Sequence, residues 1–259
     1  IGGSSLGSMH IWNINTGECT SSFSGGQNYI SCIDVSLDGG LCVSRDGYGL
    51  IRLWDLNKGI CTNVVREHSR TNAHAITPDK RHFITGGRDG AIWLWDSSAG
   101  RSQMLRDAYI SSISALVITR DGKYCICGTY DGAVFIYNIF TKEIKQFFIL
   151  ERGFADSLTC LADGRRFVIG VYGFGLQIRS LQEEKVIRDL PIDEGSSNRI
   201  VSTHDGKYCL RGSTSRSLSI WSMDDYECEH EIRRTKAISN MSVSSDGCQC
   251  ALVSSDTII

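Results

Sequence analysis

The sequence predicts an all-β domain made of repeated units, each containing four short strands. Three observations support this prediction: a pattern that recurs about every 42 residues, glycine-containing turn signals between the strands of each unit, and the absence of a convincing helical period of ten or more residues. The chain has 259 residues, which is long enough for one large all-β domain. The repeat runs through its whole length, so we expect a single domain over residues 1–259.

The repeat is anchored by a short apolar segment that ends in an aromatic residue followed by a polar one. Residues 50–55, 91–96 and 133–138 are the clearest copies. The six anchor positions are Trp12, Trp54, Trp95, Tyr137, Arg179 and Trp221. Their successive spacings are 42, 41, 42, 42 and 42 residues, which chance does not readily produce.

Turn signals divide each period into strands. Five copies carry an Asp-Gly pair upstream of the anchor, at positions 38, 121, 163, 205 and 246, and the remaining copy has Pro78-Asp79. A second turn, such as Tyr130-Asp131-Gly132, precedes the anchor segment, and a third follows it. Each period therefore holds four strands, here called a, b, c and d. A single four-stranded unit cannot bury both faces of its sheet, so the units must stack on one another.

This pattern resembles the WD40-repeat family, whose repeat of about 40–45 residues ends in Trp-Asp. Trp54-Asp55 and Trp95-Asp96 match that ending, whereas Arg179-Ser180 does not. The resemblance covers the whole chain and implies a β-propeller, a ring of blades that are each a four-stranded antiparallel sheet. We expect divergent repeats and unequal blades.

The length predicts seven blades with one incomplete, from about six repeats truncated at both ends of a longer chain. Six blades are the alternative. In that case the strands around residues 241–253 would pair with those around residues 9–23, which would remove the exposed sheet edges.

The resemblance also implies a structural hydrogen-bonded set in the best-preserved blade. In the family, a Trp, a Ser or Thr on the previous strand, an Asp in the turn between them and a His before the blade form this set. Thr85, Asp89 and Trp95 have the corresponding spacing, and His68 is in a position to supply the fourth member.

Composition and motifs exclude several functions. The net charge of −2 gives no bulk electrostatic reason to expect nucleic acid or an anionic membrane as the main partner. No apolar run approaches the length of a membrane span, and we find no hydrolase, zinc-protease or phosphate-loop motif. The 11 cysteines lack zinc-site spacing. We therefore expect no catalysis, metal or cofactor, and the unpaired cysteines favour an intracellular, cytoplasmic protein.

Binding residues are expected where the family places its b–c turns and d–a loops, at one rim and at the mouth of the central channel. Tyr and Arg are enriched at the hot spots of interfaces, and these segments carry many of them. The candidates from b–c turns are Arg45, Tyr48, Arg88, Tyr130, Tyr172 and Phe174. The candidates from d–a loops are Tyr29, Arg66, Arg70, Tyr109, Arg152, Phe154, Arg233, Arg234 and Lys236.

The function that these features favour is a non-catalytic protein–protein interaction scaffold or sensor domain within a larger intracellular multidomain protein. Its partners would be other proteins or other domains of its parent chain, and the sequence does not predict an oligomeric state. The alternative is a reader of a peptide or ligand at the channel mouth, using Arg45, Arg88, Tyr130 and Tyr172. A hydrolase is less favoured, because the predicted mouth is aromatic and basic.

Overall fold

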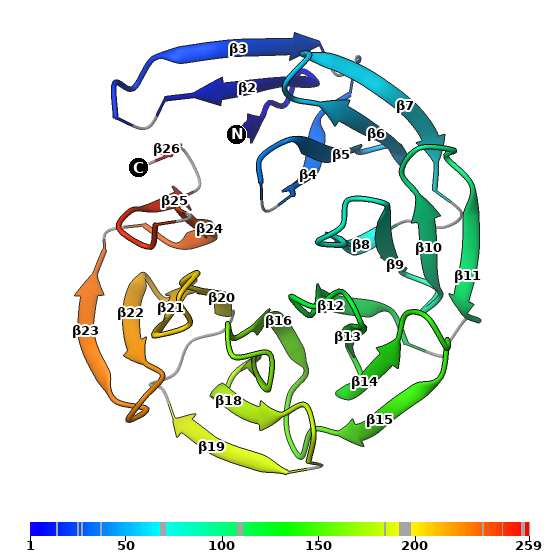
Figure 1. Ribbon diagram of the computed structural model, residues 1–259. Coiled ribbons are helices and arrows are strands. Elements are labelled where there is room, and N and C mark those ends of the chain that lie inside the picture. The colour runs from blue at the N-terminus through cyan, green and yellow to red at the C-terminus, as the bar shows by residue number, and fades with distance from the viewer. Residues whose placement is uncertain are drawn as a thin grey trace. The chain divides into compact units, whose positions relative to one another are not determined.

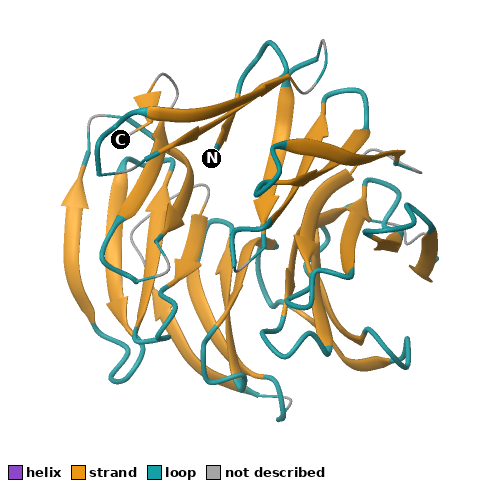
Figure 2. Ribbon diagram, turned by 45° about the horizontal axis from the view of Figure 1, so that its top comes forward, coloured by secondary structure: helices purple, strands orange, loops and turns teal. Residues whose placement is uncertain are grey.

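The computed structural model describes the chain except residues 14, 25, 27, 37, 68–70, 108–110, 184, 192–197, 235, 245, 255–256 and 259. In the described residues, all regular structure is β-strand (Figure 2). The chain divides into two compact units, Ile1–Ile110 and Ser111–Ile259. We call them unit 1 and unit 2.

Unit 1 contains three antiparallel sheets (Figure 1). The first sheet has three strands, β1 (Gly2–Gly3), β2 (Ser8–Trp12) and β3 (Cys19–Ser24). The second has four, β4 (Ile30–Val35), β5 (Leu41–Asp46), β6 (Leu50–Asp55) and β7 (Ile60–Arg66). The third has β8 (Thr71–Ile76), β9 (His82–Gly87), β10 (Ile92–Asp96) and β11 (Ser102–Arg106). The first strands of neighbouring sheets, β1, β4 and β8, contact one another in turn.

Unit 2 contains four antiparallel sheets. The first has β12 (Ile113–Ile118), β13 (Tyr124–Thr129), β14 (Ala133–Asn138) and β15 (Ile144–Ile149). The second has β16 (Ala155–Cys160), β17 (Arg166–Val171), β18 (Gly175–Ser180) and β19 (Val186–Pro191). The third has β20 (Asn198–Ser202), β21 (Tyr208–Ser213), β22 (Ser217–Ser222) and β23 (Cys228–Arg233). The last has three strands, β24 (Ile238–Val243), β25 (Cys250–Ser254) and β26 (Thr257–Ile258). Here too the first strands β12, β16, β20 and β24 are successive neighbours.

The described residues therefore form seven sheets, which confirms the predicted repeat of four antiparallel strands. The first and the last sheet have three strands each, whereas the prediction left one blade incomplete. The six-blade alternative is wrong: β25 pairs with β24 and with β26, while β2 pairs with β1 and with β3. That all 259 residues form a single domain stays a prediction.

The middle strands of each sheet are apolar because both of their faces are covered. In β17, five of six residues are buried, and in β14 the first five are buried. Ile126 and Val134 pack with Phe167 and Ile169 of the next sheet in one core cluster. The outermost strands have far more exposed residues, and every residue of β23 is exposed. Burial on both faces explains the nearly continuous apolar runs of the middle strands.

The Asp-Gly signals mark the hairpins between the first and second strands. Thr119 Oγ1 donates a hydrogen bond to Asp121 Oδ1 at 2.6 Å, and the same oxygen accepts the N–H of Lys123 at 3.0 Å. Gly122 has a φ of 69°, a left-handed conformation that glycine adopts at little cost. The same hydroxyl-to-aspartate bond recurs in four other hairpins, from Ser36, Thr77, Thr203 and Ser244.

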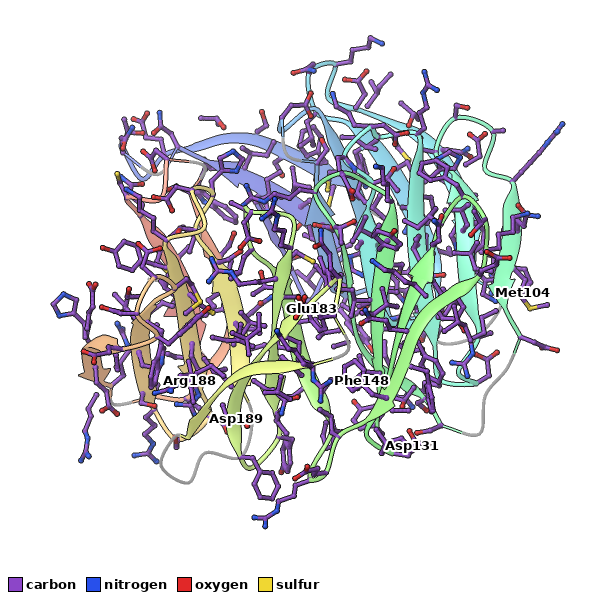
Figure 3. All side chains as sticks on the ribbon, turned by 60° about the horizontal axis from the view of Figure 1, so that its bottom comes forward. Met104, Asp131, Phe148, Glu183, Arg188 and Asp189 are labelled. Atoms are coloured by element: carbon purple, nitrogen blue, oxygen red, sulfur yellow. The ribbon has the colours of Figure 1, made fainter. Side chains whose placement is uncertain are left out.

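Arg179 shows how a repeat persists after its anchor tryptophan is lost. Its guanidinium lies 3.6 Å from the ring centroid of Phe148, which Figure 3 labels on β15. Arg179 Nε also donates to Gln177 Oε1 at 2.6 Å. A planar cation stacked on an aromatic ring covers apolar surface much as an indole does. The strand β18 therefore keeps its place although the dipeptide ending has disappeared.

One tight turn carries a side chain at a position where four other repeats have glycine. Gly7, Gly49, Gly90 and Gly132 all have positive φ in the turn between the second and third strands. At the corresponding position in the sheet of β20–β23, Arg216 has a φ of 71°. A side chain with a Cβ atom is strained in this region of conformational space.

Replacing Arg216 by glycine is expected to raise the free energy of unfolding by about 0.5–1 kcal/mol, because the relief of left-handed strain exceeds the entropy cost of glycine. Urea denaturation measures the change. Gly132→Ala is the reverse control, since an added Cβ would lie 2.9 Å from the carbonyl oxygen of Gly153 and should destabilise the fold. A loss of stability in Arg216→Gly would contradict the strain argument.

Candidate protein-interaction surface

Three aromatic side chains of unit 2 lie in a row, with Tyr130 tilted by 53° against Phe154 and Tyr172 stacked on Phe154. The rings of Tyr130 and Phe154 have centroids 4.8 Å apart, and Phe154 and Tyr172 are also 4.8 Å apart with nearly parallel planes. Tyr130 is 52% exposed and Tyr172 is 40% exposed. Large aromatic side chains left in solvent in a continuous row are typical of binding surfaces.

Local backbone contacts hold this row in place. Tyr130 lies in the turn after β13, and its N–H donates to the carbonyl of Ser112 at 3.1 Å. Tyr172 lies in the equivalent turn after β17, and its N–H donates to the carbonyl of Phe154 at 2.9 Å. Phe154 comes from the loop between β15 and β16 and fills the space between the two turns. The repeat therefore places side chains from two neighbouring sheets in one stack.

Unit 2 also has a cavity of about 270 Å³, lined in part by Phe174. Its apolar lining includes Leu150, Leu176 and Leu190, all buried, and its charged lining consists of Glu151, Arg152 and Asp189. The Arg152 guanidinium lies 5.7 Å from the ring centroid of Phe174. Asp189, labelled on β19 in Figure 3, contributes a carboxylate that accepts a hydrogen bond from Gln177 Nε2 at 2.8 Å.

We call Tyr130, Arg152, Phe154, Tyr172 and Phe174 the aromatic surface. It offers flat apolar faces, one cation and polar groups at its edge, a combination that suits binding of a protein segment. All five residues belong to the predicted binding set, and the structure brings them together within unit 2.

Arg45 occupies a different environment from the predicted one. It is only 9% exposed, and its Nε and Nη2 donate to the two carboxylate oxygens of Glu67, both at 2.7 Å. Nη1 donates to Ser31 Oγ at 2.9 Å. Burial raises the pKa of Glu67, but the hydrogen bonds from Arg45 and Thr71 and the charge of Arg45 together outweigh burial and lower that pKa. Arg45 is thus an internal ion-pair residue, and we leave it out of the proposed contact surface.

The remaining predicted rim residues do not join the aromatic surface, and Arg88 lines a cavity of unit 1 together with Tyr29 and Arg45. Tyr48 and Arg88 are exposed in unit 1, where Arg88 Nε donates to Asn72 Oδ1 at 3.2 Å. Arg233 ends β23 and is exposed, while the half-buried Arg234 donates its N–H to the carbonyl of Arg216 at 2.7 Å. Tyr109 lies outside the described residues.

The predicted structural set is present in part. Trp95 Nε1 donates to Thr85 Oγ1 at 2.9 Å, and the indole stacks on Phe83 with centroids 5.6 Å apart. Asp89 accepts the N–H of Ala91 at 3.0 Å. His68 lies outside the described residues.

The neighbouring sheet of β4–β7 has its own version of this set. Trp54 Nε1 donates to Ser44 Oγ at 2.8 Å. Asp46 is fully buried; it accepts the N–H groups of Tyr48 and Leu50 and pairs with Arg52 at 3.3 Å. This aspartate stands eight residues before Trp54, whereas Asp89 stands six residues before Trp95. The signal that could have found it is the Asp46-Gly47 pair at the end of the strand.

Two further findings concern function classes. Among the described residues, no helix is long and apolar enough to cross a membrane. Within the same residues, no group of three or more His, Cys, Asp or Glu side chains is placed to hold a metal ion.

The seven antiparallel sheets match a known architecture. The β-propeller domain of Cps50 (Swd1) from Myceliophteria thermophila superposes with a TM-score of 0.86 over 99% of this chain and 90% of that one, at 16% sequence identity. The chain is therefore a β-propeller protein. A family model described as "WD domain, G-beta repeat" matches residues 17–55, 59–96 and 105–138. The three matched segments, which together make up less than half of the chain, are thus similar to WD repeats.

Several curated proteins are similar over part of the chain. Autophagy-related protein 16 of Arabidopsis thaliana is 31% identical over 102 residues, which are 39% of this chain and 20% of that protein. Cilia- and flagella-associated protein 52 of Chlamydomonas reinhardtii is 35% identical over 30% of this chain and 12% of its own length. Small ribosomal subunit protein RACK1 of Caenorhabditis elegans is 28% identical over 34% and 27%. The matched segment thus spans between 12% and 27% of these relatives.

Replacing Glu67 by Gln is expected to lower the free energy of unfolding by about 2 kcal/mol, because Arg45 stays largely buried without its counter-charge. Thermal and urea denaturation measure the loss. Because the pKa of Glu67 is lowered in the folded state, its contribution is complete above the ordinary value of 4.5 and fades as the pH falls through the folded pKa. The difference between the two proteins should therefore shrink in acid.

The matched control is Lys123→Gln, which removes an exposed pair whose Nζ lies 4.0 Å from Asp121. It should change stability by less than about 0.5 kcal/mol. Equal effects of the two substitutions would contradict the internal role of Arg45.

Proposed function

We propose that this chain is a non-catalytic protein-interaction domain whose aromatic surface binds a segment of a partner protein. The observation that supports this most directly is the exposed stack of Tyr130, Phe154 and Tyr172 in unit 2. The similarity of residues 17–55, 59–96 and 105–138 to WD repeats agrees with it, because WD40 propellers generally serve as protein-interaction scaffolds.

The chemistry of the surface suggests the chemistry of the partner. The stacked rings present flat apolar faces, which aliphatic or proline side chains cover well. Arg152 stands over Phe174 beside them and offers a guanidinium to a carboxylate. We therefore expect an extended partner segment with apolar residues against the rings and an acidic residue near Arg152.

The proposal places the domain in a larger intracellular protein. The named relatives, an autophagy-related protein and a cilia- and flagella-associated protein, match this chain over only 20% and 12% of their lengths. All 11 cysteines are free, which suits a reducing compartment. On this proposal, the partner is either another protein or another domain of the parent chain.

Combined substitution of Phe154 and Tyr172 by alanine should abolish partner binding while leaving the melting temperature nearly unchanged. Truncating a central aromatic contact costs about 2 kcal/mol or more, so affinity should fall by at least about 100-fold for the pair. The measurement compares the proteins captured from lysate by wild type and variant, followed by calorimetric titration of the strongest partner.

Tyr48→Ala is the matched control for that experiment, since Tyr48 is an exposed tyrosine in the equivalent turn of unit 1. It should leave binding intact. Retention of every captured protein by the double variant would refute the aromatic surface as the binding site.

Binding of a peptide or ligand at the channel mouth stays a second prediction. One observation counts against the use of all four predicted residues. Arg45 has its guanidinium occupied by Glu67 and Ser31. If the domain reads a peptide or ligand in this way, combined substitution of Arg88 and Tyr130 should abolish binding without lowering the melting temperature.

A further inference from the structure

Unit 1 contains a cysteine–histidine pair that the proposed protein interaction does not use. Cys32 Sγ on β4 lies 3.0 Å from Nδ1 of His74 on the neighbouring strand β8. Both side chains line a cavity of about 220 Å³, together with Tyr29, Arg45 and Arg88 among others. A thiol within hydrogen-bond distance of an imidazole, at the wall of a cavity, is the arrangement that activates cysteine nucleophiles.

The register of the sheets shows that this histidine is not required for packing. His74 pairs with Thr85 across β8 and β9. The corresponding positions of the other four-stranded sheets are occupied by aliphatic residues, Ile33, Leu116, Leu158 and Ile200. Cys32 likewise stands where the two following sheets have Ala73 and Ala115. The pair is thus a local departure from the repeat.

A third polar residue joins the two strands beside the pair. Asp34 Oδ2 accepts the N–H of Ile76 on β8 at 2.9 Å, while Oδ1 accepts the N–H of Val35 at 2.9 Å. The corresponding positions in the neighbouring sheets hold Ala75 and Val117. The Asp34 carboxylate fixes β4 against β8 and adds negative charge near the imidazole.

The charges around the pair favour a thiolate facing an imidazolium. Burial and the negative charge of Asp34 raise the pKa of Cys32, but the charge and hydrogen bond of His74, together with the charge of Arg45, outweigh them and lower that pKa. Burial lowers the pKa of His74, but Cys32 and Asp34 outweigh burial and raise it to about 9. Arg45 lowers the pKa of both groups. Its positive charge therefore favours the thiolate of Cys32 but disfavours the imidazolium of His74.

Other cysteines of the chain provide internal references. Cys61 and Cys228 are more exposed than Cys32, yet partial burial raises the pKa of each thiol. Complete or nearly complete burial raises the pKa of Cys160 and Cys209 to about 12. Cys32 is therefore less exposed than Cys61 and Cys228 but has more thiolate character, and an experiment can exploit this difference.

We propose that Cys32, paired with His74, is a nucleophilic modification site that hydrogen peroxide oxidises to a sulfenic acid. The thiolate sulfur attacks one peroxide oxygen, so that the S–O bond forms as the O–O bond breaks. Sulfur loses two electrons and the peroxide gains them. The departing hydroxide takes the imidazolium proton from His74 and leaves as water, and neutral imidazole remains beside Cys–SOH.

The first test measures nucleophilicity by alkylation of the whole folded chain with iodoacetamide at pH 7, followed by peptide mass spectrometry over time. An ordinary thiol is only a few per cent ionised at this pH, so Cys32 should react about tenfold faster than Cys61. His74→Leu, which introduces the residue type of Leu116 and Leu158, should slow Cys32 about tenfold and leave Cys61 unchanged.

Melting temperatures establish that the variants fold, and His74→Asn provides a second, smaller substitution at the same position. It should slow Cys32 as His74→Leu does. A rate at Cys32 equal to or below that of Cys61, or one unaffected by both substitutions, would overturn the nucleophilic pair.

The second test treats the chain with hydrogen peroxide in the presence of dimedone, which traps sulfenic acids. Dimedone adducts should accumulate at Cys32 before Cys61 and Cys228, and they should decrease in His74→Leu. Fast alkylation of Cys32 without dimedone trapping above the level at Cys61 would overturn the assignment of peroxide as the oxidant.

Discussion

The two middle strands of each four-stranded sheet are largely buried and mostly apolar, and this constraint organises the rest of the structure. A sheet of this kind would expose two apolar surfaces to solvent unless a neighbouring sheet covers each of them. Within each unit the covering neighbour is the next repeat, as Ile126 and Val134 against Phe167 and Ile169 illustrate in unit 2. Each sheet must then be built from nearly the same number of residues, which explains the period of about 42 residues in the sequence.

This constraint explains why so much of the fold could be predicted from the sequence. The period identifies the strands even where the anchor residue changes, because burial demands a flat group of suitable size rather than a tryptophan. Arg179 meets that demand by stacking on Phe148. The turns could be predicted for a different reason, since each Asp-Gly pair encodes both a hydrogen-bond acceptor and a left-handed backbone, as Asp121 and Gly122 show.

The parts that could not be predicted depend on side-chain pairing across strands. Repeat position correctly grouped Tyr130 and Tyr172 in equivalent turns, but it also grouped Arg45 with the binding residues. Only the structure shows that Glu67, 22 residues further along, occupies its guanidinium. Cys32 and His74 were missed in the same way, because a thiol and an imidazole 42 residues apart carry no motif in the sequence. Their contact depends on two first strands being neighbours with a particular register.

The location of these departures follows from the same constraint. In β5 five of six residues are buried, whereas most residues of the first strands β4 and β8 are half-buried. A polar side chain in a middle strand loses its solvation and needs a partner, as Arg45 has in Glu67 and Asp46 has in Arg52, because an unpaired one costs several kcal/mol. On a first strand or in a turn the cost is much smaller, so these positions can vary while the propeller stays intact. Both the aromatic surface and the Cys32–His74 pair lie at such positions, which separates the residues that hold the fold from those available for binding or chemistry.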